Sequence, residues 1–140
     1  MKNIVVVSGG FDPIHSGHIA YFKAAKALGD ELIVGINSDE WLIRKKGKAF
    51  MPMHERQAVV QSIRYVDYAI QFNDDDDSAI LLLKLVKQTW PNDKIIFANG
   101  GDRNNTNNRE SKVEGVTFVY GVGGSNKKNS SSDILKAWKE

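Results

Sequence analysis

The chain has 140 residues, a formal net charge of +2 and no cysteine. This length suits a single domain over residues 1–140, and the lack of thiols excludes a disulfide framework, a thiolate metal site and a cysteine nucleophile. Because the net charge is small and no apolar run is long enough to span a membrane, we expect a cytoplasmic protein with no nucleic-acid or membrane partner.

The first predicted elements are a strand and a helix joined by a glycine-rich turn. The β-branched run at 4–7 is typical of a strand buried on both faces. Apolar side chains recur at helical spacing from Ile19 to Leu28, and Gly29 is a helix stop. The turn at 9–18 has the sequence Gly-Gly-Phe-Asp-Pro-Ile-His-Ser-Gly-His. Since the start of a helix leaves backbone N–H groups unpaired, this turn is predicted to bind the phosphates of a nucleotide.

Two histidines flank a glycine at this junction. His15 and His18 are three residues apart, so both imidazoles can lie on one side of the first helical turn. Gly17 has no side chain to keep a phosphate away from the backbone. A lone histidine is more often structural, but the pair at this position favours a functional role. Asp12 could belong to the site or simply close the turn.

Strands and helices alternate along the rest of the chain. In order, the predicted elements are a strand at 31–36, a basic loop at 44–48, a helix at 54–65, a strand at 68–72, a helix ending near 89, strands at 94–98 and 116–120, and a helix from about 130. This alternation predicts an α/β protein with a Rossmann-like, doubly wound parallel sheet of about five strands and flanking helices. Ligands of such sheets bind beyond the carboxyl ends of the strands.

Charged runs and tryptophans have ordinary structural explanations beside functional ones. The acidic run at 74–77 could hold a metal, but carboxylates before a helix are more typical of capping, and we predict no metal ligands. Lys45 lies in a basic run that could be a solvated face or a phosphate site. The tryptophans are predicted to pack in the protein rather than to stack on a base: Trp41, Trp90 and Trp138.

These motifs resemble those of the cytidylyltransferase-like family of nucleotidyltransferases. The family's first motif, a Gly-x-Phe-Asp turn followed by His-x-Gly-His, matches residues 9–12 and 15–18. Further segments resemble later family motifs in the same order along the chain: Lys45, Glu55-Arg56, 63–67, 99–102 and 130–134. The resemblance therefore covers nearly the whole chain.

The resemblance implies a reaction. A phosphate oxygen of a small phosphorylated acceptor would attack the α-phosphorus of CTP or ATP, releasing pyrophosphate, with Mg²⁺ accompanying the triphosphate. Such catalysis depends on positioning and electrostatics rather than on a covalent intermediate. The sequence at 123–129 replaces the Arg-Thr-Glu-Gly usual in cytidylyl-transferring members, which leaves the choice between CTP and ATP open. The resemblance also implies a homodimer.

The resemblance further implies roles for individual residues. The implied catalytic residues are His15, His18 and Lys45. The implied nucleotide contacts are Gly9, Gly10, Phe11, Gly17, Asp102, Ser130, Ser131 and Ser132, and the implied contacts to acceptor or phosphate are Asp12, Arg56 and Arg64. Gly10 stands where the family commonly has Thr or Cys, which removes a possible side-chain donor. Surface ion pairs remain an alternative for the two arginines, and helix capping for the serines.

Two other functions are compatible with parts of the sequence. A non-catalytic nucleotide-binding module would share the turn, but it would be expected to lose residues such as His15, His18, Lys45 or Arg64, which are all present. A fragment of a class I aminoacyl-tRNA synthetase would share the paired histidines, but the chain has no Lys-Met-Ser-Lys-Ser loop. The sequence therefore favours a catalytic nucleotidyltransferase.

Overall fold

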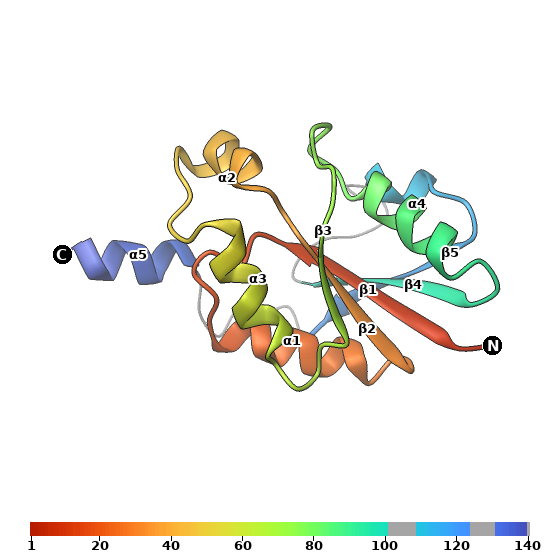
Figure 1. Cartoon of the computed structure of the whole chain (residues 1–140). Helices are drawn as coiled ribbons and strands as arrows, with labels where there is room; N and C mark the ends of the chain where they lie inside the picture. The colour runs from red at the N-terminus through yellow and green to blue at the C-terminus, as the bar shows by residue number, and fades with distance from the viewer. Residues whose placement is uncertain (101–108, 124–130, 140) are drawn as a thin grey trace.

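The centre of the molecule is a parallel sheet. In the computed structural model, which describes residues 1–100, 109–123 and 131–139, five strands pair in the order β3-β2-β1-β4-β5 (Figure 1). They are β1 (Asn3–Gly9), β2 (Glu31–Ile36), β3 (Tyr68–Gln71), β4 (Lys94–Gly100) and β5 (Val116–Val122). The direction of winding reverses between β1 and β4, which makes the carboxyl end of β1 the expected ligand position. The predicted Rossmann-like α/β sheet is confirmed.

Helices connect the strands and cover both faces of the sheet. They are α1 (Ser16–Lys26), α2 (Asp39–Lys46), α3 (Met53–Gln61), α4 (Ile80–Thr89) and α5 (Ser131–Lys139), with a 3₁₀ helix, η1 (Arg109–Lys112), before β5. Side chains of α1 and α3 join one apolar cluster and those of α4 join the other, so these helices lie on opposite faces (Figure 1). Among the described residues, no helix has the length and apolar character needed to cross a bilayer.

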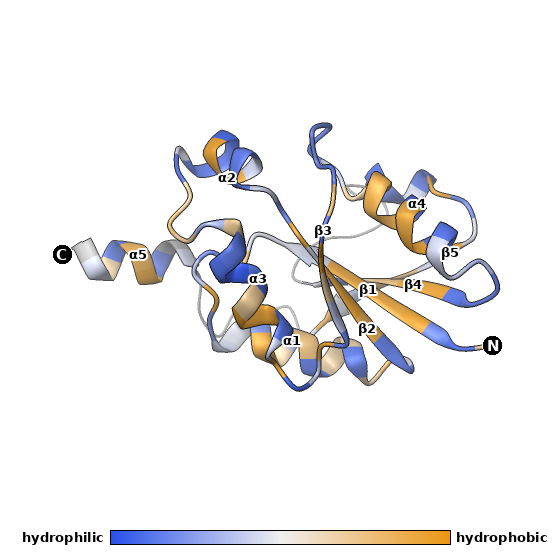
Figure 2. Ribbon diagram, viewed as in Figure 1, coloured by the Kyte–Doolittle hydropathy of each residue, from blue (hydrophilic) through white to orange (hydrophobic). Residues whose placement is uncertain are grey.

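Strand β1 shows how the sequence builds the two cores. Val5 and Val7 pack in the cluster that includes α1, whereas Ile4 and Val6 pack in the cluster that includes α4. All four side chains are completely buried. Alternate residues of a strand point to opposite faces, so a continuous apolar run fills both cores (Figure 2). The predicted burial of this strand on both faces is confirmed.

The predicted basic loop is wrong, because residues 39–46 form helix α2. Ser38 caps this helix, its Oγ accepting a hydrogen bond from the Trp41 N–H at 3.0 Å. Gly47 ends the helix in the left-handed region, at a φ of 91°. Lys45 therefore projects from a capped helix rather than from a flexible segment.

The predicted helix at 54–65 is too long. Helix α3 ends at Gln61, and the chain turns through hydrogen bonds from Ser62 N–H to the Val59 carbonyl and from Val66 N–H to the Ile63 carbonyl. Arg64 consequently lies beyond the helix. Arg56 and Arg64 therefore do not lie on one helix.

Candidate active site

The turn after β1 is built around the ring of Phe11. Phe11 adopts a φ of 52° and is 4% exposed. Its ring meets His18 edge-on at a centroid distance of 5.0 Å and Phe22 at 5.2 Å. A bulky residue with positive φ is unusual, and here the buried ring holds the imidazole of His18 in place.

The two histidines cap the helix that they begin. His15 Nδ1 accepts a hydrogen bond from Gly17 N–H at 3.0 Å, and His18 Nδ1 accepts one from His15 N–H at 3.2 Å. The two rings stack with centroids 3.9 Å apart. Because both Nδ1 atoms are acceptors, each neutral imidazole carries its proton on Nε2. Each imidazole therefore keeps its Nε2–H group as a donor for an anion, whereas the N–H groups of His15 and Gly17 are already engaged.

The surroundings keep both imidazoles neutral. Burial, followed by the charges of His15 and Lys46, lowers the pKa of His18 from 6.5 to about 3. Burial and the nearby Lys46 ammonium also lower the pKa of His15. At neutral pH the pair therefore acts through hydrogen-bond donation, while Lys46 supplies positive charge.

Lys45 and Lys46 face different parts of the site. The Lys46 ammonium donates to the Asp12 backbone carbonyl at 3.1 Å, close to the histidine turn. The Lys45 ammonium lies 5.7 Å from the centre of the Trp41 ring. Lys46 was missed from the sequence because nothing within a presumed loop distinguishes neighbouring lysines. The helical geometry of α2 separates their directions.

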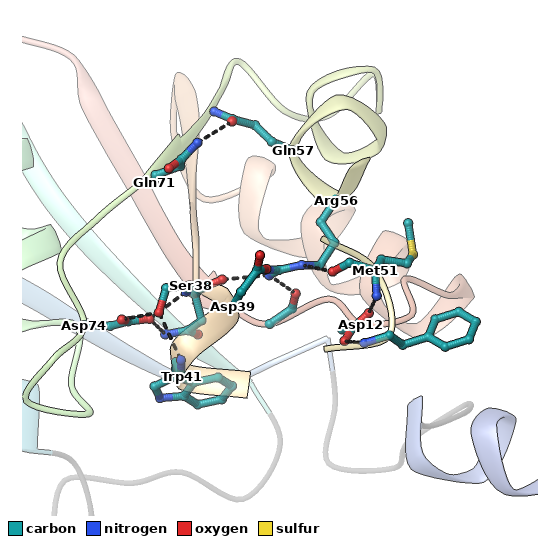
Figure 3. Close-up of polar contacts among 12 residues, drawn as sticks. Asp12, Ser38, Asp39, Trp41, Met51, Arg56, Gln57, Gln71 and Asp74 are labelled. Atoms are coloured by element: carbon teal, nitrogen blue, oxygen red, sulfur yellow. Dashed lines mark hydrogen bonds and ion pairs between the residues drawn. The ribbon is translucent and has the colours of Figure 1, made fainter. Parts of the chain in front are cut away.

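Arg56 is a buried tie between four segments (Figure 3). The side chain is 0% exposed, and its Nε donates to the Met51 carbonyl at 2.9 Å. Its Nη1 donates to the carbonyls of Gly10 and Asn37, at 2.9 and 2.7 Å, and Nη2 pairs with Asp39 Oδ1 at 2.6 Å. The predicted contact of Arg56 with an acceptor or phosphate is corrected, because its guanidinium has no exposed surface. It instead positions the turn after β1 against α2.

Asp12, like Arg56, joins separate segments of the chain through the hydrogen bonds of a buried side chain. Its carboxylate is 1% exposed and accepts hydrogen bonds from the N–H groups of Phe50 and Met51, both at 2.7 Å. These bonds fasten the segment before α3 to the histidine turn. The structure therefore supports a structural role for Asp12 rather than direct contact with substrate, but its carboxylate joins two distant segments instead of closing its own turn.

The remaining predicted site residues lie on α5, before β3 or outside the described residues. Ser131 Oγ donates to the Pro13 carbonyl at 2.7 Å, so the start of α5 adjoins the histidine turn. Ser132 is in the same helix, whereas Asp102 and Ser130 lie outside the described residues. Arg64 precedes β3, at the amino edge of the sheet, and the structure does not bring it to the histidines at the carboxyl edge.

The glycines of the turn lie against close neighbours. A Cβ on Gly9 would lie 2.8 Å from the Phe11 ring, and one on Gly10 would lie 2.9 Å from Leu42 Cδ2. Both contacts are under 3.0 Å, so a side chain at either position would force its neighbour to shift.

A hollow of about 250 Å³ lies beside this turn, beyond the carboxyl ends of β1 and β2. Its lining includes Gly9, Asn37, Trp41, Lys45, Ser78 and Glu110. The sequence did not predict it, because the lining residues come from distant segments. The hollow adds a polar compartment with one lysine to the histidine site.

Asp74, the first residue of the acidic run, holds this compartment together. Asp74, 1% exposed, accepts hydrogen bonds from Asn37 Nδ2, Ser38 N–H and Ser38 Oγ. The predicted capping of the following helix is corrected, because the Ala79 N–H at the start of α4 donates to Glu110 Oε2. Within the described parts of the chain, no three His, Asp or Glu side chains are grouped to hold a metal ion.

Comparison with known proteins agrees with this geometry. The sequence model of the family described as cytidylyltransferase-like matches residues 6–136. The Bifunctional protein HldE of a Nitratiruptor species is 40% identical over 103 residues, covering 72% of this chain and 21% of the relative. The HldE of Hahella chejuensis is 36% identical over 125 residues, covering 88% and 24%. The chain thus spans about a quarter or less of the length of these relatives.

Solved structures share the fold. A lipopolysaccharide core biosynthesis protein from Thermoplasma volcanium has a TM-score of 0.68 and 26% identity, over 92% of this chain and 100% of the other. A bifunctional NMN adenylyltransferase/ADP ribose pyrophosphatase from Francisella tularensis, complexed with AMP and a Mn ion, has a TM-score of 0.71 at 16% identity. The match covers 99% of this chain and 42% of the other. At this identity it shows only that the two proteins share a fold.

Proposed function

The chain belongs to the cytidylyltransferase-like family of nucleotidyltransferases, and we propose that it transfers CMP or AMP from CTP or ATP to a small phosphorylated acceptor. The observation that carries this proposal is the stacked pair of neutral imidazoles, whose Nε2–H groups remain as donors beside the Lys46 ammonium. This arrangement offers hydrogen bonds and charge to a triphosphate at the carboxyl end of β1.

The proposed reaction is a direct displacement. An oxygen of the acceptor phosphate forms a bond to the α-phosphorus, while the bond from that phosphorus to the bridging oxygen breaks and pyrophosphate leaves with its electrons. Both reactants are anions, so the protein must align them and offset their charge. The Nε2–H groups of His15 and His18 would donate to the triphosphate, and Lys46 would add positive charge beside them.

The remaining roles are assigned around that centre. Lys45, which lines the hollow, would bind the acceptor phosphate. The start of α5, next to the histidine turn through Ser131, would hold the β- and γ-phosphates together with Ser130 and Ser132. Gly9, Gly10, Phe11 and Gly17 would shape the nucleotide turn, and Asp102 would face the nucleotide.

Three further features belong to the proposal. Mg²⁺ would arrive bound to the triphosphate, where it would offset phosphate charge. Residues 1–140 would form one nucleotidyltransferase domain, and the domain would act as a homodimer.

The test is pyrophosphate release with CTP and ATP separately, in Mg²⁺, against a panel of phosphorylated acceptors. Turnover that needs both a nucleotide and an acceptor supports the proposal, and the active nucleotide identifies the donor. If both nucleotides bind but neither is turned over with any acceptor, the chain is a nucleotide-binding module, and the proposal fails.

A further inference from the structure

Helix α2 carries both lysines of the site but packs only lightly against the rest of the protein. In its eight residues, all of which the structure describes, Leu42 is the single buried side chain, and Ile43 is 53% exposed. Lys45 and Lys46 lie in its last turn. A helix this short is not stable by itself, so contacts with other segments must fix its direction.

The Asp74 carboxylate holds the first turn of α2 (Figure 3). Its Oδ1 accepts a hydrogen bond from Ser38 Oγ and its Oδ2 accepts one from Ser38 N–H, both at 2.7 Å. The same Ser38 hydroxyl caps the helix, because it accepts the Trp41 N–H at 3.0 Å. Asp74 is 1% exposed, so water does not compete for these bonds. The carboxylate thus fixes the residue from which α2 starts.

The backbone of Asp74 contacts the other end of the helix. Arg44 lies in the last turn of α2, and its Nη2 donates to the Asp74 carbonyl at 2.9 Å. The Arg44 side chain is substantially exposed and also pairs with Asp77, so this contact is weaker than the buried one. One residue outside the helix therefore contacts both of its ends.

Asp74 is also connected to the histidine turn. Asn37 Nδ2 donates to Asp74 Oδ2 at 3.0 Å, and Asn37 N–H donates to the Gly9 carbonyl at 2.9 Å. Gly9 ends β1, at the start of the turn that leads to His15 and His18. The buried carboxylate therefore fixes the position of α2 relative to the histidine turn.

The other aspartates of the acidic run do not share this position. Asp75, Asp76 and Asp77 are exposed, whereas Asp74 is buried. The run therefore contains one buried carboxylate at the start of α2. In Asp75 it also contains an exposed carboxylate of the same loop, which serves as the matched control.

We propose that Asp74 is a positioning residue: by holding α2 at both ends, it sets where the Lys45 ammonium lies in the hollow. Lys45 depends on this hold more than Lys46 does, because the Lys46 ammonium is also fixed by the Asp12 carbonyl. The inference rests on the proposed function, in which Lys45 binds the acceptor phosphate.

Fluorescence tests the hold on α2 without relying on turnover. In the full chain carrying Trp90→Phe and Trp138→Phe, Trp41 is the sole tryptophan. Asp74→Ala in this chain should increase the quenching of Trp41 by acrylamide about twofold, because the first turn of α2 loses its buried contact. Asp75→Ala should leave the quenching unchanged. If Asp74→Ala leaves it unchanged as well, the inference is wrong.

Steady-state kinetics test the link to Lys45. The acceptor is whichever of glycerol 3-phosphate, glucose 1-phosphate and phosphocholine the wild-type chain converts. Asp74→Ala should raise the KM for this acceptor about tenfold and the KM for the nucleotide by less than about twofold. In a Lys45→Ala chain the same substitution should change the acceptor KM by less than about twofold, because the side chain that it positions is gone. A full rise in that background too would overturn the inference.

A second pair of variants covers the case in which Asp74→Ala does not fold. Ser38→Ala removes the hydroxyl that joins the carboxylate to the cap, whereas Ser38→Thr keeps a hydroxyl there. We expect the acceptor KM to rise in Ser38→Ala and to keep the wild-type value in Ser38→Thr, and equal values would contradict the inference. A wild-type chain that converts no phosphorylated acceptor contradicts the proposed function. Wild-type turnover with an unchanged acceptor KM in the Asp74 and Ser38 variants contradicts the positioning role alone.

Discussion

At the scale of single residues, the fold converts two histidines into neutral donors. Each Nδ1 accepts a backbone N–H at the start of α1, which fixes the ring orientation and leaves the proton on Nε2. Burial then removes the charge that an exposed imidazole would gain in mild acid. The same side chains therefore cap the helix and present donors toward the position proposed for the triphosphate.

The lowered pKa values predict a pH dependence of stability. The pKa of His18 is about 3 in the folded state against 6.5 ordinarily, so the unfolded chain takes up a proton first as the pH falls. The free energy of unfolding should therefore decrease from about pH 6.5 toward pH 3, and His15 contributes in the same direction. Urea unfolding across this range measures the slope. His18→Asn should give a shallower slope, and equal slopes would show that His18 is not held neutral.

Residue identities were predicted from the sequence better than their roles. The histidine pair was found because its spacing within a strand-to-helix turn is distinctive. Arg56 was predicted to contact the acceptor or a phosphate, because the hydrogen-bond acceptors of an arginine cannot be read from a sequence. Its partners include backbone carbonyls 5, 19 and 46 residues away, which only the folded chain brings together.

At the scale of elements, α2 depends on the buried tie through Arg56. Arg56→Ala would leave the Asp39 carboxylate and buried carbonyls without their donor, and it is expected to lower the free energy of unfolding by about 3–5 kcal/mol. The rate of nucleotidyl transfer should also fall, because no side chain then joins the Gly10 carbonyl to Asp39 of α2. Chemical denaturation and pyrophosphate release measure the two effects.

Arg44 provides the matched control for this prediction. It pairs with Asp77 at a position where both side chains are substantially exposed. Arg44→Ala should therefore lower the free energy of unfolding by about 1 kcal/mol or less. If Arg56→Ala is as mild as Arg44→Ala, the buried tie does not support the site.

The contact between β2 and α4 predicts a second effect of packing. A Cβ on Gly35 would lie 2.4 Å from Leu82 Cδ2, so Gly35→Ala should cost about 1–3 kcal/mol of stability through overpacking. The cost should shrink in a Leu82→Ala background, because the clashing methyl group is gone. A double-mutant cycle by denaturant unfolding measures the coupling. If the losses in free energy of unfolding from the two substitutions are strictly additive, the close contact between Gly35 and Leu82 is contradicted.

The elements differ in how far the sequence determines them. The central strands β1, β2 and β4 were predicted well because their apolar runs are continuous and buried. Helix α2 was missed even though Ser38, Asp39 and Gly47 are standard boundary residues, since Leu42 is its only buried side chain and apolar periodicity is weak. A helix that is stabilised by its capping residues and by contacts with distant segments shows little apolar periodicity in the sequence.

At the scale of the whole molecule, the site forms where the winding of the sheet reverses. The alternation of strands and helices was enough to predict the sheet and the edge at which ligands bind. The hollow was beyond prediction, because its lining combines the ends of β1 and β2 with α2, residues 77–79 and η1. Such a compartment depends on long-range packing rather than on any one motif.

Association of two chains is a further prediction at this scale. Leu81 and Leu85, four residues apart on α4, are 39% and 42% exposed and offer apolar surface to a second copy. Sedimentation velocity should give twice the chain mass of 15.6 kDa. A single-chain mass at assay concentrations would contradict the homodimer.

The most direct measurement of the central claim follows a label on the α-phosphate of CTP and ATP. The wild-type chain should move this label into a product with the acceptor, and His18→Asn should slow the transfer by about 10²–10³-fold, because asparagine can replace the Nδ1 acceptor of the cap but not the Nε2–H donor. Circular dichroism should show that the variant stays folded. Label that never reaches the acceptor, or a folded variant that transfers it at the wild-type rate, would contradict catalysis by the histidine pair.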